Sequence, residues 1–70
     1  MEEIIERLFN IISERSLKWM EYKELFGEDD DITQHIFNSI CGLDEAFEII
    51  SGHSYTTHLI ARIEENMKAS

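Results

Sequence analysis

The chain has 70 residues, with 15 Asp and Glu against 6 Lys and Arg, a formal charge of -9 at neutral pH, and 43% hydrophobic residues. Scarce basic side chains argue against direct binding to nucleic acid or to anionic membranes, and the apolar content argues against disorder. A chain this short buries only about 60% of its unfolded surface, so its core needs a supplement. The single cysteine, Cys41, excludes an intrachain disulfide, and self-association is the supplement that we favour.

The composition also bears on location. The chain opens with three residues, Met1, Glu2 and Glu3, that do not resemble the basic start of a signal peptide. No apolar run approaches the ~20 residues of a transmembrane helix, and an unpaired thiol is typical of a reducing compartment. We therefore expect a cytoplasmic protein with a single helical domain over residues 1–70.

The first segment predicts a long amphipathic helix over residues 2–26, followed by a stop at Gly27. Arg15 and Ser16 fall in line with its apolar stripe, so the helix either breaks there or extends the Arg15 side chain across the core. We favour one continuous helix. The stripe consists of Ile4, Leu8, Ile11, Ile12, Trp19, Tyr22 and Phe26.

The next two segments predict a helix over residues 32–51 and a shorter one over residues 55–68, beginning near Ser54 or Thr56. Gly42 lies inside the second segment, where it marks either a kink or a split into two shorter helices. Because the linkers are short, we expect consecutive helices to be antiparallel neighbours. The predicted fold class is all-α: a helical hairpin plus a third helix, assembling as a homodimeric helical bundle. The seam of the second helix consists of Ile36, Ile40, Leu43, Phe47 and Ile50.

Four consecutive acidic residues, Glu28 to Asp31, form the turn over residues 27–31 before the second helix. Asp31 and Gln34 have the spacing of a capping box, and Asp29 and Asp30 add negative charge at the positive end of the helix dipole. An EF-hand calcium loop needs a Glu at its twelfth position, and a loop that starts in this acidic run has none there. A calcium site is therefore disfavoured. Capping therefore explains part of the run.

The acidic excess is concentrated in the middle of the chain. Residues 24–61 hold eight acids and no Lys or Arg, a net charge of -8. Such a segment either serves solubility or forms a surface that steers and docks a basic protein, with Phe37 as its apolar anchor. The candidate protein-binding residues are Glu28, Asp29, Asp30, Phe37, Asp44, Glu45 and Glu48.

The first helix carries apolar residues on more than one face, and a helix of this kind must bury against more than one neighbour. Three helices in a monomer offer limited cover, so we expect packing across a two-fold axis in a homodimer. Scattered exposed apolar residues on a monomer are the alternative. The expected interface residues are Ile5, Phe9, Ile12, Trp19 and Met20.

Catalytic and metal chemistry find little support in the sequence. Cys41 and His35 lie on different faces of one predicted helix, where they cannot form a nucleophile and its base. His53 and His58 are five residues apart and lack the companions of a zinc site. We expect no enzyme activity, no cofactor and no metal.

The sequence thus predicts a small non-enzymatic protein that binds itself and a basic protein partner, as a regulator, adaptor or inhibitor. Three alternatives stay open. One is an acidic antagonist such as an immunity protein, an antitoxin or a phage-type DNA mimic. Another is a structural homo-oligomer subunit with no separate ligand. The third is a metal-dependent protein, with His53 and His58 as the residues that could contribute to a site.

Overall fold

The computed structural model describes the backbone of residues 2–69 and the side chains of residues 2–68. The described chain contains three helices and no strand: α1 (Glu2–Phe26), α2 (Asp31–Ser51) and α3 (Tyr55–Ala69). The all-α, three-helix fold class is therefore confirmed. The first and last positions of the expected domain, 1 and 70, lie outside the described residues.

Glycines end the first two helices, and a side-chain cap begins the third. Gly27 and Gly52 adopt left-handed φ angles of 91° and 82°, which are unfavourable for residues with a Cβ atom. Each donates its N–H to the carbonyl four residues before it, at 2.9 Å. Ser54 begins α3, since its Oγ accepts a hydrogen bond from the Thr57 N–H at 3.2 Å.

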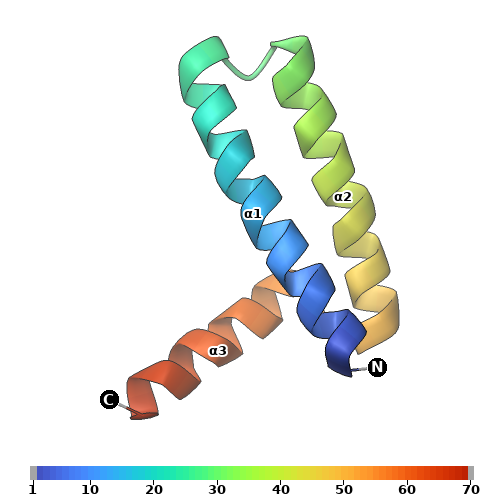
Figure 1. Ribbon diagram of the computed structural model, residues 1–70, viewed down its shortest axis with the longest axis vertical. Helices are drawn as coiled ribbons and strands as arrows, with labels where there is room; N and C mark the ends of the chain where they lie inside the picture. Colours follow the sequence, from blue (N-terminus) through green and yellow to red (C-terminus); the bar gives the residue numbers. More distant parts are fainter. Residues whose placement is uncertain (1, 70) are drawn as a thin grey trace.

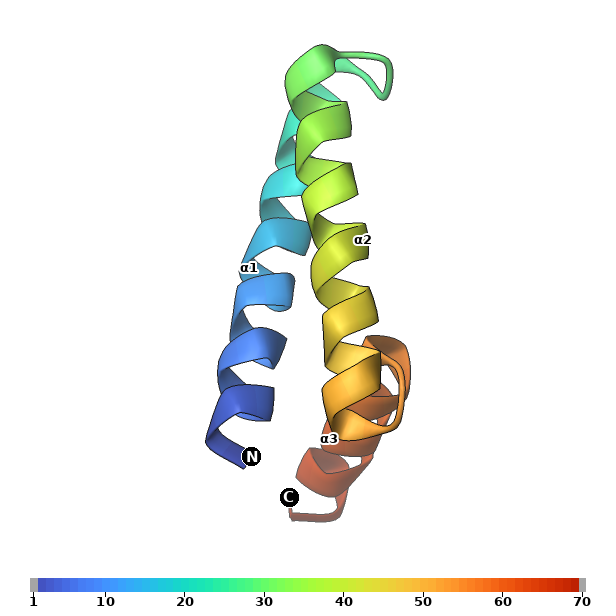
Figure 2. The ribbon, with the colours of Figure 1, turned by 90° about the vertical axis from the view of Figure 1, so that its right-hand side faces the viewer.

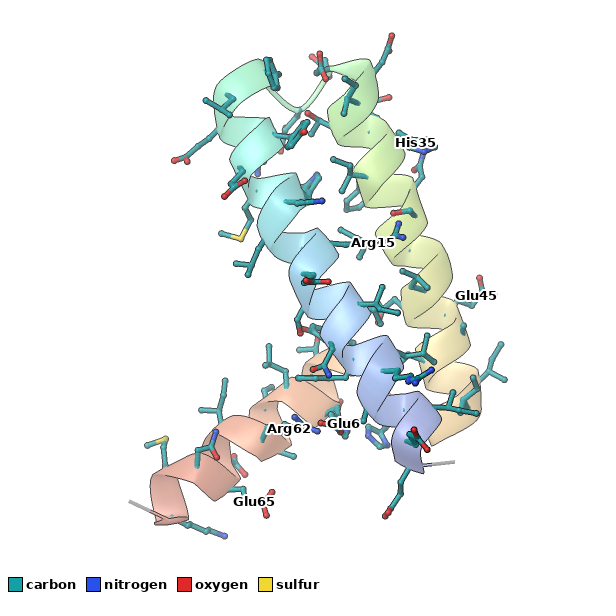
Figure 3. All side chains as sticks on the ribbon, in the orientation of Figure 1. Glu6, Arg15, His35, Glu45, Arg62 and Glu65 are labelled. Carbon is teal, nitrogen blue, oxygen red and sulfur yellow. The ribbon has the colours of Figure 1, made fainter. Side chains whose placement is uncertain are left out.

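α1 and α2, whose apolar patterns are interrupted at Arg15 and Gly42, are each one continuous helix. α1 runs through Arg15, whose Nη1 donates a hydrogen bond to the Ser39 Oγ of α2 at 2.9 Å; Figure 3 shows this side chain between the two helices. α2 runs through Gly42, where an added Cβ atom would meet nothing within 4 Å. The alternative of a split at Gly42 is thus wrong, and no helix packs closely against this glycine.

α1 and α2 form an antiparallel hairpin, whereas α3 leaves the end of the hairpin at a large angle (Figures 1 and 2). The expected antiparallel packing of α3 along α2 is therefore wrong. The radius of gyration is 13.6 Å, compared with about 11 Å for a compact chain of this length. The molecule is consequently open on the side where α3 departs.

The core lies where the three helices meet. Phe9 and Ile12 of α1 and Phe47 of α2 are buried. The centre of the Tyr55 ring lies 5.1 Å from that of Phe9. This core is small, and it is extended by the partly buried residues Ile5, Leu8, Ile40, Leu43, Tyr55 and Leu59.

Polar contacts also join α3 to α1. The Tyr55 hydroxyl and the Ser13 Oγ are 2.7 Å apart. Arg62 places its guanidinium 4.5 Å from the centre of the Phe9 ring and forms an ion pair with Glu6, as the labelled side chains in Figure 3 show. These contacts hold the first half of α3 against the N-terminal half of α1.

Candidate functional site

The turn between α1 and α2 uses one carboxylate of the acidic run to cap α2. The Asp30 Oδ2 accepts hydrogen bonds from the N–H groups of Ile32 at 3.0 Å and Thr33 at 3.3 Å. The cap is therefore Asp30, and the expectation that Asp31 fills this role was wrong by one residue. The correction follows from backbone geometry, because Asp30 has the extended conformation of a cap (φ -65°, ψ 137°) while Asp31 is already helical.

The two preceding acids, Glu28 and Asp29, are exposed and accompany aromatic residues. Glu28 forms an ion pair with Lys23, with 3.0 Å between Oε1 and Nζ. The same Nζ lies 4.9 Å from the centre of the Trp19 ring. An exposed ion pair of this kind contributes only about 0–1 kcal/mol to stability, but it shows that a cation fits between this carboxylate and the indole.

An aromatic pair joins the two helices beside this turn. The ring centres of Trp19 in α1 and Phe37 in α2 are 5.5 Å apart, and Phe37 remains 46% exposed. The pair borders a hollow of about 480 Å³ on the protein surface. The residues that line this hollow are Trp19, Glu28, Asp29, Gln34, Phe37 and Asn38. A hollow lined by two aromatic rings and two carboxylates suits a partner side chain that is both apolar and basic.

The remaining candidate acids lie further along α2. Asp44 and Glu48 follow Phe37 by seven and eleven residues, so they share its side of the helix; seven residues of α-helix span about 10 Å. Glu45 is exposed and lies on the outer edge of α2, away from α1 (Figure 3). We call the seven candidate residues the acidic face: Glu28, Asp29, Asp30, Phe37, Asp44, Glu45 and Glu48.

Asp44 differs from its neighbours on this face. It is only partly exposed, and its Oδ1 is buried without a hydrogen-bond partner among the described residues. A buried carboxylate oxygen without a partner destabilises a fold. Asp44 is thus a poor position at which to test binding, whereas Glu45 and Glu48 are exposed.

The residues expected at a dimer interface do not form one surface. Phe9 and Ile12 are 7% and 1% exposed, and Ile5 packs against them in the core of the single chain. Trp19 contacts Phe37 beside the turn, and only Met20, at 58%, is largely exposed. An interface between copies would have to use other residues together with Met20.

Sequence reasoning assigned Trp19 to a dimer interface and Gln34 to a capping box, and it gave Asn38 no role, so it missed that all three line the hollow beside the turn. The position of Gln34 was a usable signal, because Phe37 and Asn38 follow it by three and four residues and residues at these spacings are neighbours on a helix surface. Nothing in the sequence pairs Trp19 with Phe37. That contact depends on how the two helices are rotated against each other.

The three histidines are not part of the acidic face, whereas Cys41, four residues after Phe37 and three before Asp44, lies on the same side of α2 as these residues. His53 Nε2 and His58 Nδ1 are 3.0 Å apart in two stacked rings, and His58 also packs beside the ring of Phe47. His35 lies on the outer edge of α2 (Figure 3), and the thiol of Cys41 is free and exposed. Within residues 2–69, no group of three or more His, Cys, Asp or Glu side chains is placed to hold a metal ion.

None of the helices in the described part of the chain combines the length and the apolar character that a membrane span needs. Comparison of the chain with protein-family models, with curated proteins and with solved structures found no match.

Proposed function

We propose that this chain is a non-enzymatic binding protein that docks a basic segment of another protein on its acidic face, and so acts as a regulator, an adaptor or an inhibitor. The observation that carries the proposal is the Trp19–Phe37 pair, which is partly exposed and lines a hollow together with Glu28 and Asp29. The hollow supplies apolar area to be buried on binding. The carboxylates supply attraction and orientation.

The charge distribution supports a basic partner. The eight acids of residues 24–61 have no Lys or Arg among them, so few ion pairs within that segment can neutralise this surface. Long-range attraction raises the rate at which a basic partner associates, and salt weakens it. The contact of Lys23 with both Trp19 and Glu28 is an intramolecular example of the recognition that we propose.

Affinity purification from the native host, with elution at low and then high salt and mass spectrometry of the eluate, tests the proposal. A stoichiometric basic protein released by salt is the expected result. The informative variant replaces three exposed acids by lysine: Asp29→Lys, Glu45→Lys and Glu48→Lys. Asp30 and Asp44 stay unchanged because the first caps α2 and the second is partly buried.

The matched control makes the same change of charge at three exposed residues outside the acidic face: Glu21→Lys, Glu64→Lys and Glu65→Lys. The proposal requires that the first variant lose the partner while the control retains it. Loss of the partner in both variants would show that net charge alone determines binding. Retention of the partner in both variants would show that the acidic face is not the docking surface.

We further propose that the chain is a cytoplasmic homodimer. The free, exposed thiol of Cys41 is compatible with a reducing compartment. Exposed large apolar side chains far outnumber the three buried ones of the core, which supports self-association. Light scattering is expected to give twice the monomer mass at micromolar concentration, and a mass near 8.3 kDa would contradict the dimer.

Two other functions keep specific support. The uniform charge of residues 24–61 also suits an acidic antagonist, such as an immunity protein, an antitoxin or a phage-type DNA mimic, that occupies the nucleic-acid surface of its target. Competition between this chain and DNA for the captured partner would favour that function. The exposed apolar surface suits a structural homo-oligomer subunit, which would elute as an assembled oligomer without any partner.

A further inference from the structure

Apolar surface on α1 and α3 has no cover within the described chain. Leu17 and Met20 of α1 are 65% and 58% exposed, and Ile60 and Ile63 of α3 are 51% and 50% exposed. None of these residues belongs to the core or lines the hollow beside the turn. We call these four residues the α1–α3 apolar surface.

The two halves of this surface border the same open side of the molecule. The Ser13–Tyr55 contact places the first turn of α3 on the Ser13 side of α1, and Leu17 and Met20 continue that side at i+4 and i+7. Figure 3 shows Glu65 on the lower edge of α3, the edge turned away from the C-terminal half of α1. Ile60 and Ile63 lie roughly opposite Glu65 around the helix, so they border the space between α3 and the C-terminal half of α1.

The exposed area indicates how much cover is missing. The chain exposes 5514 Å², whereas a compact monomer of 8.3 kDa exposes roughly 4,600 Å² by the scaling of surface with mass. The excess of about 900 Å² is close to the ~800 Å² that each partner contributes to a stable interface of standard size. One interface with a second copy would therefore bring the protomer to ordinary compactness.

The charge of α3 distinguishes this surface from the acidic face. α3 carries Arg62 and Lys68 against Glu64 and Glu65, so it offers no net charge to a basic or acidic partner. An apolar surface of low net charge is complementary to itself, and a two-fold axis places the same residues on both sides of an interface.

From this open shape and missing cover we infer that the α1–α3 apolar surface is the dimer interface, in which Ile60 and Ile63 of each protomer cover Leu17 and Met20 of the other. The inference rests on the proposed self-association and specifies its surface. Of the residues first expected at the interface, Phe9 and Ile12 lie in the core, and this interface uses exposed residues that a second copy can contact in their place. It leaves the acidic face of both protomers open to a basic protein.

Sedimentation equilibrium on the full chain and on single variants tests the interface. Leu17→Lys and Ile63→Glu each place a charge in the proposed contact, and each is expected to raise the dissociation constant of the dimer at least about tenfold. Ile49→Glu is the matched control, because Ile49 is 77% exposed on α2 and lies outside this surface. Circular dichroism checks that all variants retain their helices.

Mixing the two disrupting variants gives a sharper test. In a two-fold dimer the Leu17→Lys protomer can pair its lysine with the glutamate of the Ile63→Glu protomer, so the equimolar mixture is expected to dimerise more tightly than either variant alone. A wild-type chain that is monomeric would overturn self-association and this interface together. A wild-type dimer that both variants leave intact, or whose mixed variants show no recovery, would overturn the interface and preserve the dimer.

Discussion

Thr33, in the first turn of α2, lies in a place where its hydroxyl has no partner. The residue is 1% exposed, and its Oγ1 is buried without a hydrogen bond among the described residues. A buried polar group without a partner costs roughly 1–3 kcal/mol. Valine has nearly the shape of threonine and a similar helix propensity, so Thr33→Val removes this cost without leaving a cavity. We expect a gain of at least about 1 kcal/mol in the free energy of unfolding.

For a domain of this size, about 1 kcal/mol corresponds to a rise of ~4–8 °C in Tm. Thermal unfolding followed by circular dichroism measures it, with both proteins at one concentration because self-association makes Tm depend on concentration. Thr56→Val is the control. Because Thr56 is exposed, this substitution is expected to change the free energy of unfolding by less than about 0.5 kcal/mol, and the shift in Tm should be correspondingly small. An unchanged or lower Tm for Thr33→Val would show that the hydroxyl is satisfied and would refute the reasoning.

Three further predictions concern the glycines of α2 and its C-terminal end, the N-terminal cap of α2, and the contact of α3 with α1. Gly42→Ala is expected to stabilise the chain by up to about 1 kcal/mol, because the new Cβ atom meets no neighbour. Gly52→Ala is expected to destabilise the chain, because φ is 82° at this position. Urea unfolding of both variants measures the two effects. Asp30→Ala is expected to cost about 1 kcal/mol in the same assay and Asp31→Ala clearly less, and equal losses would contradict the cap. Tyr55→Phe removes the hydroxyl contact to α1 and is expected to lower the free energy of unfolding by about 1 kcal/mol. Amide hydrogen exchange in α3 should become faster, and an unchanged exchange rate would contradict this prediction.

The helices were largely predictable from the sequence, because their signals are local. Helical spacing of apolar residues predicted each element, and Gly27 predicted where the first one ends. The cap of α2 was misplaced by one residue, since Asp30 and Asp31 are chemically identical and only the backbone angles select between them.

The candidate site was predictable only in part. The charge of residues 24–61 and the exposure of Phe37 follow from the residue types and their spacing. The partnership of Phe37 with Trp19, the burial of the Asp44 Oδ1 and the use of Asp30 as a cap all depend on neighbours that are distant along the chain or on backbone conformation.

By itself the sequence determined that the chain forms three helices, where they begin and end to within a residue or two, and where its charge lies. Only the tertiary structure decided that Phe9, Ile12 and Phe47 form the core and that α3 leaves the hairpin. Periodicity gives the direction of each side chain about its own helix axis, but the rotation and crossing angle between helices follow from how their side chains interlock. The same apolar stripe can therefore be covered by the chain itself or remain exposed for another copy.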